Sequence, residues 1–77
     1  MVDNREKLVE LAYAKMPFGK YKGYYLVDIP EAYYLWFRQK GFPENKLGLQ
    51  MQSMLEIKTN ELEPLIRNVR KLYPKKV

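Results

Sequence analysis

The chain has 77 residues, no cysteine and no histidine, which excludes a disulfide framework, a thiolate metal site and the commonest general base and zinc ligand. Its formal net charge of +5 indicates a basic surface, and such a surface attracts nucleic acid, anionic lipid and acidic proteins alike. Hydrophobic residues make up 47% of the chain, enough for one compact core, so we predict a single domain over residues 1–77.

The first predicted element is a helix over residues 4–14. Apolar residues recur there at helical spacing, and Asp3 with Glu6 has the spacing of a capping box. The helix should end before Pro17, because a proline disfavours the helical conformation in the residue that precedes it.

Residues 16–27 predict a short β-hairpin with a basic tip. Gly19 and Gly23 bracket the turn K-Y-K, and glycine reaches positive φ without a steric cost. The residues from Tyr24 onward are aromatic or β-branched, as is usual in strands. An isolated hairpin is marginal in water, so this one should pack on helices.

A second helix is predicted over residues 29–40. Asp28 and Glu31 repeat the capping-box spacing, and Pro30 falls in the first turn, where its missing N–H costs nothing. Gly41 stands at the position where a left-handed glycine ends many helices.

The C-terminal half should contain two helices, over residues 46–58 and 61–73. Within one continuous helix Pro64 would delete a hydrogen bond and clash with the carbonyl group of Asn60, at a cost of about 3 kcal/mol. A single kinked helix is the alternative.

We therefore predict an α+β domain in which a short β-hairpin packs against three or four α-helices. Its core should consist of large apolar and aromatic side chains that recur at the spacing of these elements. The predicted core residues are Leu8, Leu11, Phe18, Leu26, Ile29, Tyr33, Trp36, Phe37, Leu47, Met51, Leu55, Leu62, Leu65, Ile66 and Val69.

The sequence contains no recognisable catalytic, metal or cofactor site, and we predict a protein that is not an enzyme. Ser53 is the only serine, and without a histidine the usual nucleophile–base pair has no base. The glycine spacing of G-K-Y-K-G fits neither a Walker sequence nor G-x-G-x-x-G. Acidic residues at the predicted helix starts are explained by the helix dipole, which favours them there.

The basic turn is the candidate binding site. Lys20 and Lys22 would contact phosphates, and Tyr21 or Tyr24 would stack on an exposed base. A structural explanation stands beside this one, because a tight turn needs its glycines and lysine is an ordinary residue at a solvated tip. The sequence alone leaves both explanations open.

Three joined motifs carry a family resemblance. They read P-F-G-K-Y-K-G-x-x-L-x-D-I-P-x-x-Y-x-x-W-F, K-G-F-P-x-x-K-L-G and E-I-K-x-N, and they lie within residues 16–65. This pattern resembles the small bacterial proteins described as putative quorum-sensing-regulated virulence factors, a description that records a regulatory context and implies no biochemical activity. The chain departs from the family pattern at Glu61, where we expect glycine, and this puts a left-handed turn after Asn60 in doubt.

A shorter pattern, F-G-K-x-K-G followed by P-x-x-Y-x-x-W, resembles the accessory domain of exonuclease X-like nucleases. This resemblance implies association with nucleic acid but no nuclease activity, because the catalytic acidic residues of those nucleases lie in a different domain. The matching positions are Phe18, Gly19, Lys20, Lys22, Gly23, Pro30, Tyr33 and Trp36.

Two functions follow as hypotheses. The first is a non-catalytic nucleic-acid-binding accessory module that uses the basic turn. The second is a protein–protein adaptor or regulatory protein that uses an apolar surface of the C-terminal helices. The sequence shows neither a membrane-spanning stretch nor a signal-peptide core, so we expect a cytoplasmic protein without a membrane partner. The oligomeric state is not indicated by the sequence.

Overall fold

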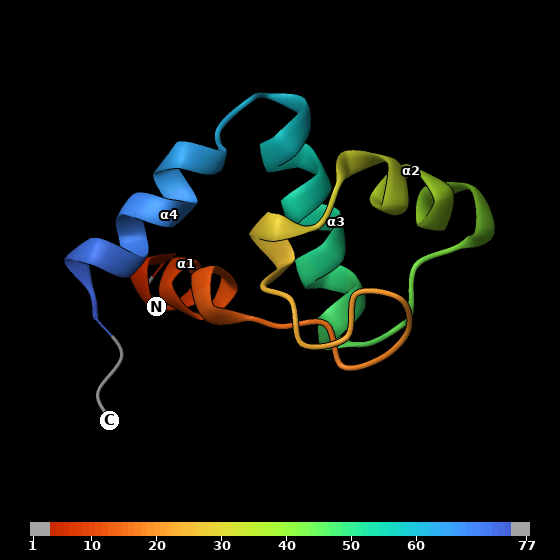
Figure 1. Cartoon of the computed structure of the whole chain (residues 1–77), viewed down its shortest axis with the longest axis horizontal. Coiled ribbons are helices and arrows are strands. Elements are labelled where there is room, and N and C mark those ends of the chain that lie inside the picture. Colours follow the sequence, from red (N-terminus) through yellow and green to blue (C-terminus); the bar gives the residue numbers. More distant parts are fainter. Residues whose placement is uncertain (1–3, 75–77) are drawn as a thin grey trace.

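A computed structural model describes residues 4–74, and the regular elements in this range are all helices joined by loops (Figure 1). No β-strand occurs among the described residues, where a single antiparallel bridge joins Lys15 and Tyr25. None of the described helices is long and apolar enough to cross a membrane. The elements are α1 (Asn4–Tyr13), the 3-10 helix η1 (Leu26–Asp28), α2 (Glu31–Lys40), α3 (Lys46–Thr59) and α4 (Glu63–Leu72).

The predicted α+β class and its β-hairpin are therefore wrong. The N–H of Asp28 donates to the carbonyl oxygen of Tyr25 at 2.9 Å, so the chain coils into η1 where the second strand was predicted. Burial explains this preference, because Leu26 and Val27 are both buried. A strand would direct two successive side chains to opposite faces, and one of them would leave the core.

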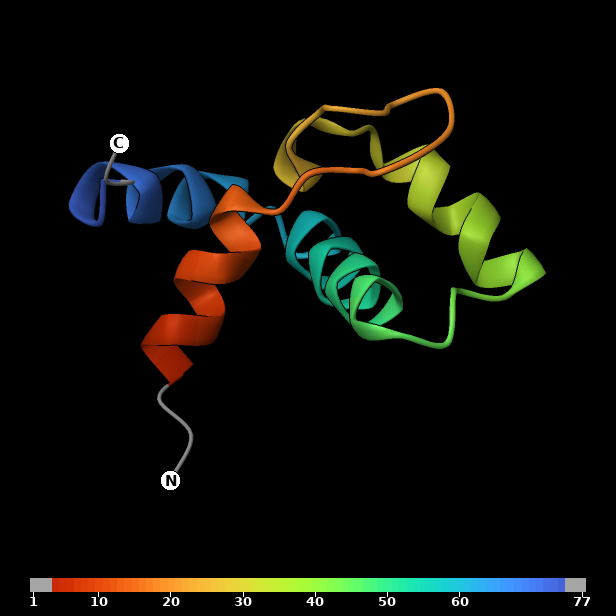
Figure 2. The ribbon, with the colours of Figure 1, turned by 90° about the horizontal axis from the view of Figure 1, so that it is seen from below.

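The helices form two packed pairs with η1 between them. α1 packs against α4 and α2 against α3, while η1 contacts α1, α3 and α4. Figures 1 and 2 show α3 in the centre of the molecule, with the α1–α4 pair on one side and α2 on the other. The residues of η1 thus lie where α1, α3 and α4 meet, and α2 reaches them through the side chain of Tyr34.

The core agrees with the predicted list in part. Seven of the predicted residues are buried: Leu11, Leu26, Ile29, Met51, Leu55, Ile66 and Val69. Three are partly buried: Tyr33, Phe37 and Leu47. Five are exposed, contrary to the prediction: Leu8, Phe18, Trp36, Leu62 and Leu65. Five buried hydrophobic residues were not predicted: Ala12, Met16, Val27, Tyr34 and Met54.

Tyr34 takes the core position of α2 that was predicted for Trp36. Its side chain is fully buried, and its hydroxyl donates a 2.7 Å hydrogen bond to the carbonyl oxygen of Leu26. Trp36 lies two residues further along the helix and is 52% exposed. A tyrosine can enter this core because η1 offers its hydroxyl group an acceptor.

The start of α2 also differs from the prediction. The helix begins at Glu31, Pro30 stands in the N-cap position, and no side chain caps the free backbone donors. The predicted capping box of Asp28 and Glu31 is wrong, because both carboxylates accept hydrogen bonds from other helices instead. The corresponding capping box of Asp3 with Glu6 lies outside the described residues.

The connection from α2 to α3 is held by two glycines. Gly41 has a φ of 104°, and its N–H donates to the carbonyl oxygen of Phe37 at 2.6 Å. Gly48 packs so closely that a Cβ atom there would lie 1.7 Å from the carbonyl oxygen of Pro43. A side chain at position 48 would therefore push the start of α3 away from the preceding loop.

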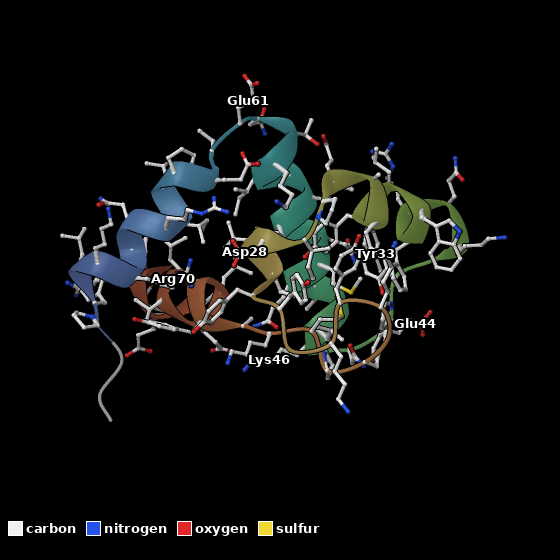
Figure 3. The ribbon with its side chains drawn as sticks, viewed as in Figure 1. Asp28, Tyr33, Glu44, Lys46, Glu61 and Arg70 are labelled. Atoms are coloured by element: carbon white, nitrogen blue, oxygen red, sulfur yellow. The ribbon has the colours of Figure 1, made fainter. Side chains whose placement is uncertain are left out.

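A left-handed turn separates α3 from α4. Glu61 adopts a φ of 57°, and the N–H of Leu62 donates to the carbonyl oxygen of Ile57 at 2.9 Å, as in a Schellman motif. Pro64 is the second residue of α4, where its missing N–H removes no hydrogen bond. The doubt about a left-handed turn at this position was wrong, because Glu61 adopts it without being a glycine (labelled in Figure 3).

Candidate functional site

The basic loop, residues 16–25, lies beside α2 and is fixed by its own backbone. The N–H of Met16 donates to Tyr24 at 2.9 Å, and the N–H of Gly23 donates back to Met16 at 2.8 Å. A further bond from Leu26 to the carbonyl oxygen of Ala14, at 2.9 Å, ties the end of the loop to its beginning. These bonds give the loop a path like that of a hairpin, but the paired segments are too short to form strands.

Both glycines of the loop have positive φ, 77° at Gly19 and 87° at Gly23, as the turn prediction required. Gly19 has a second constraint, because a Cβ atom there would lie 3.2 Å from the hydroxyl oxygen of Tyr33. Gly23 has open space around it, so only its backbone conformation requires glycine. Gly19 therefore allows the loop to pack closely against Tyr33 of α2, and Gly23 allows the chain to reverse direction.

Aromatic rings connect the basic loop to α2 in a continuous series that we call the aromatic ladder: Tyr24, Tyr21, Tyr33, Phe37 and Trp36. Successive rings meet edge to face, with centroids 5.5, 4.8, 5.1 and 5.1 Å apart. The interior members are partly buried, whereas Tyr24 and Trp36 at the two ends are each 52% exposed. Figure 3 shows Tyr33 on α2 where the basic loop passes.

Positive charge accompanies the outer end of the ladder. Lys20 and Lys22 are exposed, and within the described part of the chain neither forms an ion pair. The Nζ atom of Lys20 lies 5.5 Å from the ring centroid of Tyr21, a cation–π distance. Phe18, at the start of the turn, is 42% exposed. The loop thus presents aromatic rings and uncompensated cations together.

Comparison with known proteins identifies the family. The family model described as "Putative quorum-sensing-regulated virulence factor" matches residues 4–69. The chain belongs to this family. It is 50% identical over 68 residues to Uncharacterized protein YpeB of Escherichia coli K12, which covers 87% of this chain and 94% of that protein. YpeB of Escherichia coli O157:H7 gives the same values. No solved structure gives a significant match.

The family resemblance drawn from the motifs is thus confirmed. The similarity to the accessory domain of exonuclease X-like nucleases is not shown by these comparisons and stays a resemblance of motifs. The matched range of the family contains the whole basic loop and the aromatic ladder. The family description names a regulatory context, so the chemistry of the site has to be argued from its residues.

The D-I-P and E-I-K-x-N motifs of this family member meet at η1, and their residues have a structural role there. Lys58 donates a 2.7 Å hydrogen bond to the carbonyl oxygen of Val27, and its Nζ atom lies 3.8 Å from a carboxylate oxygen of Glu63. Arg67 donates to Asp28 at 2.8 Å. Burial lowers the pKa of the Lys58 ammonium group below its ordinary value, while nearby Glu63 opposes this shift. These contacts fasten η1 to α3 and α4.

Sequence reasoning missed Lys58 and Tyr34, which hold the base of the basic loop from outside it. Lys58 was assigned no role from the sequence, although its side chain is only 8% exposed. The signal that could have found it is its fixed place in E-I-K-x-N, one helical turn after Met54 and Leu55, which are buried. Of the motif residues singled out from the sequence, Asp28 binds Arg67 of α4, and Pro30 stands in the N-cap position of α2.

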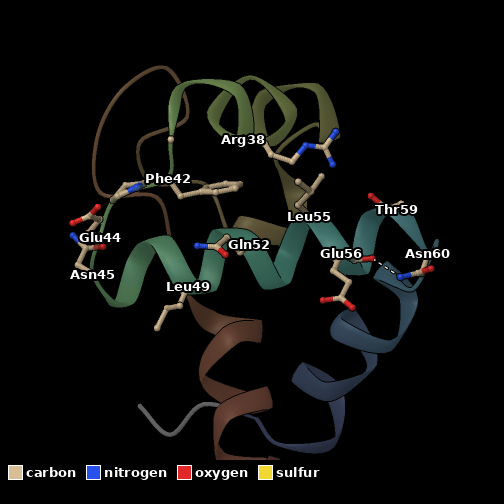
Figure 4. A pocket seen from close by; sticks show the side chains of 12 residues that line it. Arg38, Phe42, Glu44, Asn45, Leu49, Gln52, Leu55, Glu56, Thr59 and Asn60 are labelled. Carbon is tan, nitrogen blue, oxygen red and sulfur yellow. Dashed lines mark hydrogen bonds between the residues drawn. The ribbon is translucent and has the colours of Figure 1, made fainter.

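Two hollows of the described surface that matter for the predicted sites lie away from the basic loop. One, of about 930 Å³, lies between α2 and α3, and Figure 4 shows Arg38, Phe42 and Leu55 around it. Of the motif residues singled out from the sequence, only Gly41 borders it. The other, of about 710 Å³, is an apolar groove between α1, α3 and the start of α4. Among the described residues no cluster of acidic side chains could hold a metal ion.

Proposed function

We propose that this protein is a non-catalytic nucleic-acid-binding module whose contact surface is the basic loop. The observation that carries the proposal is the juxtaposition of two unpaired lysines, Lys20 and Lys22, with the half-exposed ring of Tyr24. Lysines free of ion pairs can neutralise phosphates and release their counterions, and an exposed ring can stack on a base.

The fixed shape of the loop supports the proposal. Five backbone hydrogen bonds and two glycines of positive φ hold the lysines at the tip before any ligand arrives. A preorganised loop loses less conformational entropy on binding than a flexible one. The stacking idea also required exposed tyrosines, and Tyr24 meets this condition better than Tyr21, which lies between Tyr24 and Tyr33.

The test is fluorescence anisotropy of a labelled oligonucleotide at about 50 and 200 mM salt, titrated with the wild type and with a Lys20→Gln, Lys22→Gln variant. A Lys7→Gln, Lys71→Gln variant is the matched control, because it removes the same charge from exposed positions on α1 and α4.

We expect the loop variant to bind more weakly, with a shallower salt dependence, and the control to bind like the wild type. Each lost phosphate contact should reduce the slope of log affinity against log salt by about 0.7 for a single strand. Equal losses in both variants would mean that net charge alone drives binding. That outcome, or no binding by the wild type at the lower salt, would overturn the proposal.

A second candidate function is a protein–protein adaptor, favoured by the apolar groove. Leu8, Leu49 and Leu62 line it and are 41%, 67% and 42% exposed. The occupant that suits it is an amphipathic helix of a partner, laid in with leucines at i, i+3, i+4 and i+7. Peptides of that pattern should be enriched in a display selection on the wild type and lost on a Leu49→Asp variant. No enrichment would exclude this adaptor function.

A further inference from the structure

One face of α2 continues the surface of the basic loop. Tyr33, Trp36, Phe37 and Lys40 stand at positions i, i+3, i+4 and i+7, so they lie along one side of the helix. Tyr33 contacts the basic loop through Tyr21, with ring centroids 4.8 Å apart. The side chains of Trp36 and Lys40 therefore extend from the contact with the loop toward the C-terminal end of α2.

The other side of α2 faces α3. Tyr34 is fully buried there, and Arg38, four residues later, borders the hollow between α2 and α3 (Figure 4). Arg38 and Lys40 thus stand in the same last turn and carry the same charge, but they point to different sides of the helix. This pair provides a matched comparison within one helical turn.

The exposure of Trp36 is not explained by packing. Its ring meets Phe37 edge to face, with centroids 5.1 Å apart and planes at 89°, and it remains 52% exposed. Tyr24, at the opposite end of the aromatic ladder, is exposed to the same extent. A cation accompanies each end: Lys22 stands two residues before Tyr24, and Lys40 stands one helical turn after Trp36. The two ends of the ladder therefore repeat one combination of ring and cation.

We infer that the surface binds single-stranded nucleic acid across two stacking points, Tyr24 on the basic loop and Trp36 on α2, with Lys40 as a phosphate contact. The inference rests on the proposed function and names its substrate class. In a duplex the faces of the bases are covered by their neighbours, whereas unpaired bases can lie against aromatic rings. Two separate rings on one surface suit a flexible strand, whose bases can turn outward one at a time.

The experiment uses the full chain with an unstructured single-stranded oligonucleotide and a duplex of the same sequence. Trp36 is the only tryptophan, so quenching of tryptophan fluorescence reports stacking at this position alone. Anisotropy measures the affinity of the wild type and of Trp36→Leu, Trp36→Phe, Lys40→Gln and Arg38→Gln. The phenylalanine variant keeps a ring, and Arg38→Gln is the charge-matched control for Lys40→Gln.

We expect the single strand to quench Trp36 and to bind more tightly than the duplex. Trp36→Leu should weaken single-strand binding by about fivefold or more, the lower range for one stacked base, and Trp36→Phe should restore most of it. Lys40→Gln should weaken binding and Arg38→Gln should not. Circular dichroism would show that each variant retains its helices, because Trp36 and Lys40 contribute little to the core.

The outcomes separate this inference from the proposed function. If binding depends on Lys20 and Lys22 but is equal for duplex and single strand and unchanged in Trp36→Leu, the stacking inference is wrong and the loop site stands. If Lys40→Gln and Arg38→Gln behave alike, the continuation along α2 is wrong. If the wild type binds neither oligonucleotide, the proposed function fails and the inference fails with it.

Discussion

The basic loop and η1 are neighbours in sequence and opposites in environment. Phe18 and Tyr24 of the loop are 42% and 52% exposed, whereas Leu26 and Ile29 of the following segment are fully buried. Both segments are rich in large side chains, so composition does not distinguish them. They differ in the hydrogen bonds of their backbones. The carbonyl groups of η1 accept hydrogen bonds from side chains of α2 and α3, whereas the backbone of the loop bonds to other backbone groups of the loop and its ends.

This difference indicates that η1 contributes to stability and that the basic loop is available for binding. The contacts of η1 explain why its residues are apolar, because they fill the space between three helices. No such contact explains the exposed rings and free lysines of the loop. Changes at η1 should therefore lower the free energy of unfolding, and changes at the loop tip should act on binding.

The largest expected effect is that of Leu26→Ala, which should lower the free energy of unfolding by about 2–5 kcal/mol because it leaves a cavity in the core. Tyr24→Ala removes a larger side chain from a half-exposed site and should cost far less. Urea denaturation followed by circular dichroism measures both. Similar losses in the two variants would break the comparison, because the loop would then be part of the core.

Tyr34→Phe should lower the free energy of unfolding by about 0.5–1.5 kcal/mol, because it removes the shorter of the two hydrogen bonds that the carbonyl oxygen of Leu26 accepts and leaves only the 3.3 Å bond from the N–H of Ile29. Burial raises the pKa of the Tyr34 hydroxyl above its ordinary value of 10.0, so only the unfolded chain ionises readily just above pH 10. The contribution of the neutral Tyr34 hydroxyl group to the free energy of unfolding is therefore complete below pH 10. Above pH 10 it should fall by about 1.4 kcal/mol per pH unit.

The pH dependence provides a control for Tyr34 that a single variant does not. Urea titrations at pH 9 and pH 11 should show a larger loss for the wild type than for Tyr34→Phe, by about 1.4 kcal/mol. An identical loss in both proteins would show that Tyr34 ionises in the folded state as freely as in the unfolded chain. The bond that joins α2 to η1 would then contribute little.

The smallest expected change in the free energy of unfolding comes from substitutions in the turns at Glu61 and Gly23. Glu61→Gly should raise the free energy of unfolding by about 0.5–1 kcal/mol, because glycine adopts the left-handed conformation that strains glutamate. Gly23→Ala makes the opposite change in the basic loop, with open space around the new methyl group, and should destabilise through its backbone alone. Thermal unfolding of both variants should give shifts of opposite sign. Shifts of the same sign would show that side-chain contacts govern these turns.

Helix positions were largely predictable from the sequence because their signals are local. Pro17, Pro30, Gly41 and Pro64 mark breaks between helices, and the described helices end within a few residues of them. The β-hairpin was predicted wrongly because aromatic and β-branched residues favour strands as a class. Whether Leu26 and Val27 point the same way depends on three helices that come later or earlier in the chain.

The candidate site was predictable in position but not in extent. The glycines and lysines of the loop signalled a turn, and the structure places them at one. The link from Tyr21 to Tyr33 joins residues on different elements, and no periodicity within either element reveals it. Trp36 was assigned to the core because aromatics at helical spacing usually lie there. The core side of α2 is instead the one that carries Tyr34, whose hydroxyl group donates to the carbonyl oxygen of Leu26.

The pairing of α1 with α4 has a consequence for how the molecule folds. The hydroxyl group of Tyr13 reaches the carbonyl oxygens of Arg70 and Tyr73, at 3.3 and 3.1 Å, so the first and last helices close one long loop. Contacts this distant in sequence slow folding, because chain entropy is lost before they form. On the ribosome, α1 can contact η1 and α3 early, but its main packing partner, α4, reaches it only after leaving the exit tunnel. The core, which includes Ile66 and Val69 of α4, is therefore completed only after α4 has been synthesised.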